Sequence, residues 1–271
     1  MKKMRIFFVL IFTFYVFFTA NLSYAGLEGN IYKVSYVCYD SKGNKRWQAT
    51  AEIQHKEGDV FIITENMRGI YSGFNDEISW IARTEFKRTK DTVRPLSMEQ
   101  RVFDRSEKQV ALNKQDFNYA DMVVTCIQED LVKNKTIKKK FEFSKDIVNR
   151  LLQGVYVQKF IENGKVDKEI QVITPEPALY NVRLKMVGKE DIEINGRKRT
   201  AFKICFDPML GFLNFVKVFL PKAYVWHSSE PIYELLKYEG PESGVNSCNV
   251  EIVSQDKNVP KTIPFYQGSA N

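Results

Sequence analysis

The stretch DIEINGRKRTAFKICFDP, Asp191–Pro208, decides the fold. Its segment Phe202–Phe206 alternates apolar side chains with Lys203 and Cys205, which is the period of a β-strand with one buried face. The dipeptide Asn195-Gly196 precedes this strand, and it favours a two-residue hairpin turn because both central positions of that turn need positive φ. The sequence therefore predicts an antiparallel hairpin with an aromatic inner face.

The residues that follow extend this sheet. We expect Tyr224 and Trp226 to continue the aromatic face, and Cys248–Ile252 to supply another strand. Between them lies an apolar insertion, 209–220, in which Phe212 and Phe215 are spaced as on one face of a helix. It could pack permanently as core, cover an apolar ligand as a lid, or touch a membrane surface. Twelve residues are too few to span a bilayer.

The N-terminal half alternates in the same way between polar turns. Strands are predicted at residues 30–39, 47–54, 60–64, 77–86, 92–103, 109–112, 122–127 and 137–143. Pro95 lacks a backbone donor, so the strand that holds it should begin there or lie at a sheet edge.

One short helix is expected at 144–153. Ser144 is a good N-cap and Gly154 would end the helix. A hairpin should follow, in which 155–161 pairs with 166–173 around Asn163-Gly164. The whole pattern predicts a mainly β fold, a curved antiparallel sheet or half-barrel, as a single domain over 26–254 with an irregular tail at 255–271.

The first 25 residues are typical of a signal peptide. Lys2, Lys3 and Arg5 precede an apolar run, and Ser23–Ala25 offers small residues for cleavage after Ala25. The sequence thus predicts a periplasmic protein with no transmembrane segment after cleavage. Three positive charges of the net +7 lie in this peptide, so the charge indicates solubility and gives no support for nucleic-acid binding.

Catalytic and metal chemistry find no support in the sequence. Cys38, Cys126, Cys205 and Cys248 are too widely spaced for a zinc site, although an exported chain could pair them as disulfides, and the pairing is open. His227 and Ser228 are neighbours on a predicted strand and point to opposite faces, so they are unsuited to act as base and nucleophile. We expect no enzyme, cofactor or metal.

Several short features resemble a family of exported bacterial proteins, domain-of-unknown-function family 3108. They are Arg94-Pro95, the segment FDRSEK at 103–108, a helix near Asp146, a G-R-x-x-x-A-F strand at 196–202 and VWHSSEPIYEL at 225–235. The resemblance implies a curved half-barrel similar to periplasmic lipoprotein carriers, and no known activity. The insertion at 209–220 and the four cysteines depart from the pattern.

The leading hypothesis is a non-enzymatic protein that binds or carries an apolar ligand, a lipid or lipoprotein acyl chain. Its candidate lining residues are Phe206, Phe212, Phe215, Tyr224 and Trp226. The alternative is an envelope interaction module with a filled core, which would dock a partner protein by strand addition at 92–103 or 137–143. Lysines 133, 135, 138, 139 and 140 near the second edge could attract anionic headgroups, but they fit a solvated edge strand better. A cavity would separate the two hypotheses, because a half-barrel filled by its own side chains cannot hold a ligand.

Overall fold

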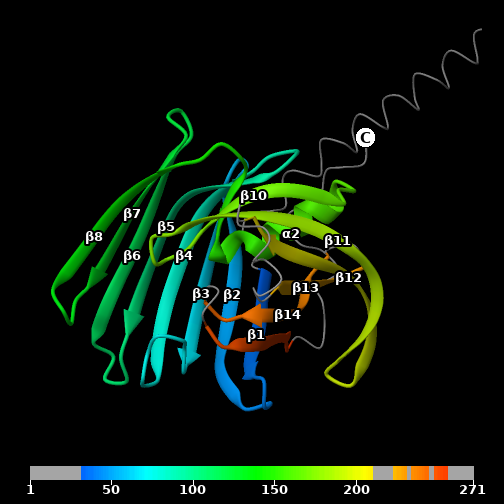
Figure 1. Ribbon diagram of the computed structural model, residues 1–271, viewed down its shortest axis with the longest axis horizontal. Helices are drawn as coiled ribbons and strands as arrows, with labels where there is room; N and C mark the ends of the chain where they lie inside the picture. The colour runs from blue at the N-terminus through cyan, green and yellow to red at the C-terminus, as the bar shows by residue number, and fades with distance from the viewer. Residues whose placement is uncertain (1–31, 210–221, 231–232, 244–246, 256–271) are drawn as a thin grey trace, which may run out of the picture.

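The computed structural model describes residues 32–209, 222–230, 233–243 and 247–255. Within them it confirms the mainly β prediction: 15 strands form one open, strongly curved sheet (Figure 1). The predicted signal peptide, Phe212 and Phe215 of the insertion, and residues 256–271 of the tail lie outside the described residues.

The strands follow the chain as β1 (Tyr32–Asp40), β2 (Lys45–Glu57), β3 (Val60–Gly69), β4 (Ile78–Arg88), β5 (Val93–Phe103), β6 (Gln109–Asn118), β7 (Val123–Asp130), β8 (Lys135–Glu142), β9 (Ile147–Asn149), β10 (Asp167–Ile173), β11 (Leu179–Ile194), β12 (Arg197–Pro208), β13 (Ala223–Ser228), β14 (Leu235–Pro241) and β15 (Asn249–Ser254). A 3₁₀ turn, η1 (Arg150–Leu152), and helix α2 (Gln153–Glu162) lie between β9 and β10.

The two ends of the described sequence meet in the middle of the sheet. Its order is β8-β7-β6-β5-β4-β3-β2-β1-β15-β14-β13-β12-β11-β10-β9, so β1 pairs with both β2 and β15. Every pairing is antiparallel except that of the short β9 with β10. The edges of the sheet are β8 and β9.

The hairpin predicted at Asn195-Gly196 is confirmed. Asn195 and Gly196 have φ of 52° and 71°, and Ile194 pairs with Arg197 across the turn. Positive φ at both central residues is the condition that a two-residue turn between right-twisted strands imposes. This dipeptide therefore fixes the register of β11 and β12.

The helix prediction at 144–153 was wrong in position. Helix α2 begins where that helix should end, at Gln153, and the predicted strand at 155–161 is helical. Gly154 is the second residue of the helix, and Ser144 caps nothing helical, since its amide donates to the Gln171 side chain.

The Asn163-Gly164 dipeptide ends this helix instead of turning a hairpin. The Gly164 amide donates to the Ile161 carbonyl, and the Lys165 amide donates to the Phe160 carbonyl. With Gly164 at φ 63°, this is a Schellman cap. Most of α2 is buried, including Val155, Val157 and Ile161, because the helix lies inside the curve of the sheet. A helix covered on most sides shows no clear 3.6-residue stripe, so its alternating valines looked like a strand.

The prediction of an exposed edge at 92–103 was wrong, since β5 pairs with both β4 and β6. The other alternative for Pro95, that its strand begins there, is close to the structure, because β5 begins at Val93. Pro95 is tolerated because it pairs only with Phe86 of β4, beside a register shift, and β6 first joins β5 at Ser97. The second predicted edge, 137–143, does fall on the edge strand β8.

We call β9, η1 and α2 together the plug (Ile147–Glu162). Its apolar side chains share one core with the inner faces of β1–β5 and β10–β13. Buried Asn149 ties it to the sheet, since its amide donates to Thr84 Oγ1 of β4 at 3.0 Å. In Figure 1 the sheet curves around this segment. Among the described residues, no helix has the length and apolar character needed to cross a membrane.

Candidate functional site

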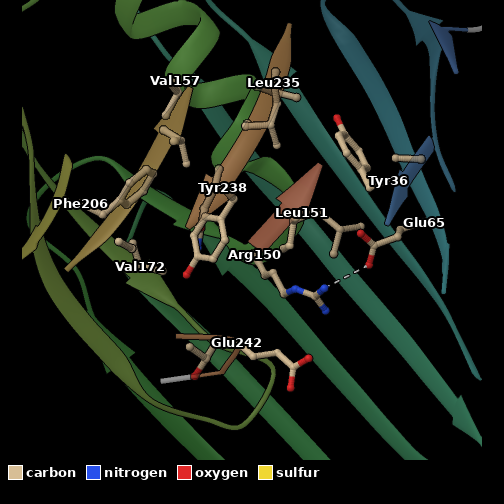
Figure 2. Close-up of a pocket in the computed structure, with 18 of the residues that line it drawn as sticks. Tyr36, Glu65, Arg150, Leu151, Val157, Val172, Phe206, Leu235, Tyr238 and Glu242 are labelled. Carbon is tan, nitrogen blue, oxygen red and sulfur yellow. Dashed lines mark ion pairs between the residues drawn. The ribbon is translucent and has the colours of Figure 1, made fainter. Parts of the chain in front are cut away.

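A cavity of about 340 Å³ lies between the inner face of the sheet and the plug. Small-molecule pockets generally enclose about 300–1,000 Å³. Strands β1–β3 form one wall, α2 a second, and β10–β14 a third. The apolar lining includes Val34, Tyr36, Ala51, Ile53, Ile63, Val155, Val157, Val172, Val182, Phe206, Ala223, Val225 and Leu235. Figure 2 shows several of these side chains around the space.

Gly154 leaves part of this space open. It lies in the first turn of α2 and lines the cavity, and a Cβ placed on it would meet no atom within 4 Å. A glycine within a helix costs about 0.5–1 kcal/mol relative to alanine. Because Gly154 lines the cavity, a larger side chain at this position would reduce the free volume of the cavity.

One end of the cavity is polar and centres on Arg150 of η1. Its guanidinium carbon lies 4.6 Å from the centre of the Trp80 ring and 5.4 Å from that of Tyr71. Those two rings meet edge to face, with centroids 4.8 Å apart. The nearest carboxylate oxygen is Glu65 Oε1, at 3.7 Å (Figure 2). Burial opposes the charge of Arg150 and is the largest single effect, but Glu65, Tyr71, Glu176 and Glu242 together outweigh it and raise the pKa, so the group stays cationic.

Glu242 lies beyond Arg150 and is fully occupied. Arg46 donates to its two oxygens at 3.0 Å each, Trp47 Nε1 donates at 2.7 Å, and the Ser72 amide donates at 2.7 Å. Burial alone would raise the pKa of this carboxyl, but these hydrogen bonds outweigh it and lower the pKa. Glu242 therefore joins the end of β14 to β2 and to the segment after β3.

His227 of β13 is a buried histidine on the cavity wall. Its Nδ1 lies 2.6 Å from the Tyr233 carbonyl oxygen and donates to it, while Nε2 has no hydrogen-bond partner among the described residues. Burial lowers its pKa to about 4. The ring is therefore neutral at pH 7, and Nε2 is an unfilled acceptor.

Three of the five sequence-predicted lining residues lie among the described residues, and the structure places them on two faces of the sheet. Phe206 lines the cavity, whereas Tyr224 and Trp226 do not. Phe206 pairs with Ala223, so Ala223 and Val225 share its face, and the two aromatic residues point to the opposite one. There Trp226 packs with Ile194, Ala201 and Leu236 and donates to Glu190. The assumption of one continuous aromatic face was wrong by one residue of register.

Sequence reasoning missed Arg150, Glu65 and Tyr36. A signal for Glu65 existed, because it occupies the inward-facing register between Ile63 and Met67 on β3. A carboxylate in an apolar register is seldom buried without a partner. No such signal marked Arg150, because its position depends on where the plug lies.

Of the thiols, Cys38, Cys126 and Cys205 are buried and Cys248 is exposed, and all four are free. Burial raises the pKa of Cys126 to about 11, which makes that thiol a poor nucleophile. Among the described residues, no group of three or more His, Cys, Asp or Glu side chains is placed to bind a metal ion.

Comparison with solved structures gives four matching chains. One of these is a protein from Bacteroides fragilis that is assigned as exported and as having a YmcC-like fold. The alignment covers 82% of this chain and 92% of that protein. The sequence identity is 8% and the TM-score 0.30. No protein-family model and no curated protein matches the sequence. The resemblance to domain-of-unknown-function family 3108 therefore stays a prediction.

Proposed function

We propose that this protein is a non-enzymatic periplasmic carrier that holds an apolar ligand, a lipid or an acyl chain, between its curved sheet and its plug. The observation that carries the proposal is the cavity of about 340 Å³, which the sheet and the plug leave unfilled. Its walls are mostly aliphatic, so water inside them makes few hydrogen bonds and is displaced favourably by hydrocarbon.

Several features support a role in binding over one in catalysis. The polar groups near the cavity are engaged in ways that suit recognition: Glu242 is hydrogen-bonded on both oxygens, and His227 is neutral at pH 7. The Ser72 hydroxyl donates to Glu242, but the lowered pKa of that carboxyl makes it a weak general base for a nucleophile. Periplasmic location rests on the predicted signal peptide.

A role as an envelope interaction module has one supporting observation. Edge strand β8 is exposed along much of its length, and its outer edge is free to pair with another strand. However, Lys138, Lys139 and Lys140 lie on it, and lysine on an edge strand opposes such pairing. The carrier function is therefore favoured, with a partner envelope protein as the second candidate.

The test uses Gly154. Gly154→Trp should fill the cavity, and Gly154→Ala is its matched control. Protein exported to the periplasm would be analysed by native mass spectrometry, and its organic extract examined for lipid. We expect a bound lipid with the wild type and Gly154→Ala, and at least a tenfold lower occupancy with a folded Gly154→Trp. Equal occupancy in all three proteins, or protein that neither co-purifies with lipid nor takes up added lipid, would overturn the proposal.

A further inference from the structure

Arg150 is a sheltered cation whose hydrogen-bonding capacity is unused. Its side chain is 23% exposed and lines the cavity. A guanidinium has five N–H donors, and none of those of Arg150 donates a hydrogen bond to another described residue. The Glu65 oxygen at 3.7 Å is too distant for one. The Trp80 and Tyr71 rings hold the guanidinium by cation–π contact and offer it no oxygen acceptor at their faces.

Glu65 is held away from Arg150 by another bond. Its Oε1, the oxygen that lies 3.7 Å from Arg150, accepts from Trp80 Nε1 at 2.8 Å, and this bond holds the carboxylate beyond hydrogen-bonding distance of the guanidinium. Glu65 thus offsets the charge of Arg150 without filling its donors. Glu242 cannot take that place either, because Arg46, Trp47 and Ser72 already surround it. A guanidinium whose N–H groups are free within a cavity can donate two parallel hydrogen bonds to the two oxygens of a carboxylate or a phosphate.

The wall that leads away from Arg150 is largely apolar, although His227 also lines the cavity. From Arg150 the space continues past Val172 and Leu151 toward Phe206, Val157 and Leu235 (Figure 2). A volume of about 340 Å³ is at the small end for ligand pockets, which favours one hydrocarbon chain over two. The polar end of the cavity thus holds one cation, Arg150, near the carboxylates of Glu65, Glu176 and Glu242, and a long hydrophobic wall leads away from it.

We propose that the ligand is a single-chain amphiphile with an anionic end group, a fatty-acid carboxylate, which Arg150 binds while the chain lies along the Phe206–Leu235 wall. This inference rests on the proposed carrier function and adds the chemical class of the ligand. A phosphate end group shares the same recognition chemistry, so the experiment includes it as a separate arm.

The experiment compares three probes with the same chain: dodecanoate, methyl dodecanoate and monododecyl phosphate. Each is titrated by calorimetry, below its aggregation concentration, into protein freed of lipid. Hydrogen bonds to charged groups are worth about 1.5–3 kcal/mol, so dodecanoate should bind at least about tenfold more tightly than its methyl ester. Dodecanoate should also bind more tightly than the phosphate, whose larger head group fits the sheltered end less well.

Two variants with opposite expected effects add to this comparison. Arg150→Met keeps the length of the side chain and should reduce dodecanoate affinity to that of the ester, leaving the ester unchanged. Glu65→Gln keeps an acceptor for Trp80 and removes the opposing charge, so it should strengthen dodecanoate binding severalfold and leave the ester unchanged. Arg94→Met is the control, because Arg94 also stacks on an aromatic ring, that of Tyr119, but lies outside the cavity lining.

The outcomes separate the two proposals. If no probe binds, the carrier function fails together with this inference. If acid and ester bind equally to the wild type, the carrier function stands and the role of Arg150 is refuted, with no variant needed. Preferential binding of monododecyl phosphate would overturn the carboxylate assignment.

Discussion

Glu242 shows how a single buried charge can join distant parts of the chain. Its side chain is fully buried and binds Arg46 and Ser72, which precede it by well over a hundred positions. Removing one partner of such a pair leaves the other charge uncompensated. We expect Glu242→Gln to lower the free energy of unfolding by about 3 kcal/mol or more, measured by urea denaturation.

The control for this change lies on β14, the strand that ends just before Glu242. Glu239 pairs with Lys237 on the surface, with 46% of its side chain exposed, and Glu239→Gln should cost less than about 1 kcal/mol. Similar losses for the two variants would mean that the Glu242 network contributes no more than a surface ion pair.

His227 makes a prediction about pH. Burial lowers its pKa to about 4 from an ordinary value of 6.5, so the unfolded chain binds a proton more readily than the folded protein. The resulting stability is present in full above pH 6.5 and is lost as the pH falls from 6.5 toward 4. His227→Asn keeps a donor for the Tyr233 carbonyl, and it should flatten the fall in unfolding free energy between pH 7.5 and 5. An unchanged dependence of the unfolding free energy on pH in His227→Asn would contradict the attribution of this dependence to His227.

At the scale of the element, two glycines, one in the first turn of helix α2 and one just beyond its C-terminal end, should respond in opposite directions. Gly164 holds the C-cap at φ 63°, so Gly164→Ala should cost about 1 kcal/mol. Gly154 is helical and has open space around it, so Gly154→Ala should be neutral or stabilise by up to about 1 kcal/mol. Thermal and urea unfolding of both variants would measure this. The sequence-based helix at 144–153 requires the reverse order, because Gly154 would then be the cap.

Helix α2 also shows what a short stretch of sequence can predict and what it cannot. The Asn195-Gly196 hairpin follows from two residues, because a turn between two paired strands is set by its own backbone angles. The Asn163-Gly164 dipeptide is locally almost identical, yet it caps a helix. The two dipeptides differ in the burial of their surroundings. Strands from both halves of the chain enclose the plug, and a short stretch of sequence does not show which distant strands will pack around it.

The candidate site shows the same limit. Phe206 could be assigned to the inner face from the alternation of β12 alone, whereas Tyr224 and Trp226 required the register between β12 and β13. The chain between β12 and β13 includes the apolar insertion. The pairing of these two strands therefore cannot be worked out by counting residues along the sequence. One residue of slip exchanges the two faces of a strand.

At the scale of the whole molecule, the sheet stays open, and side chains hold its two ends together. Phe117, Val124 and Cys126 from β6 and β7 pack against Ile147 of β9 and Ile173 of β10. Lys139 of edge strand β8 donates to the Pro177 carbonyl at 3.1 Å. A small barrel with continuous hydrogen bonding fills its interior with its own side chains. An open sheet whose ends are held together by side-chain packing around a plug can leave part of its interior unfilled.

That unfilled volume leads to a prediction about global stability. A ligand that binds only the folded state stabilises it by about 2.7 kcal/mol at a concentration of 100 Kd. Saturating dodecanoate should therefore raise the unfolding midpoint of the wild type and of Gly154→Ala, and leave that of Gly154→Trp unchanged. Because Gly154→Trp fills the cavity with its own side chain, its midpoint without ligand should equal or exceed that of the unliganded wild type. A Gly154→Trp protein that is less stable and still responds to dodecanoate would mean that the ligand binds elsewhere, and that the space beside Gly154 is closed by repacking of the plug.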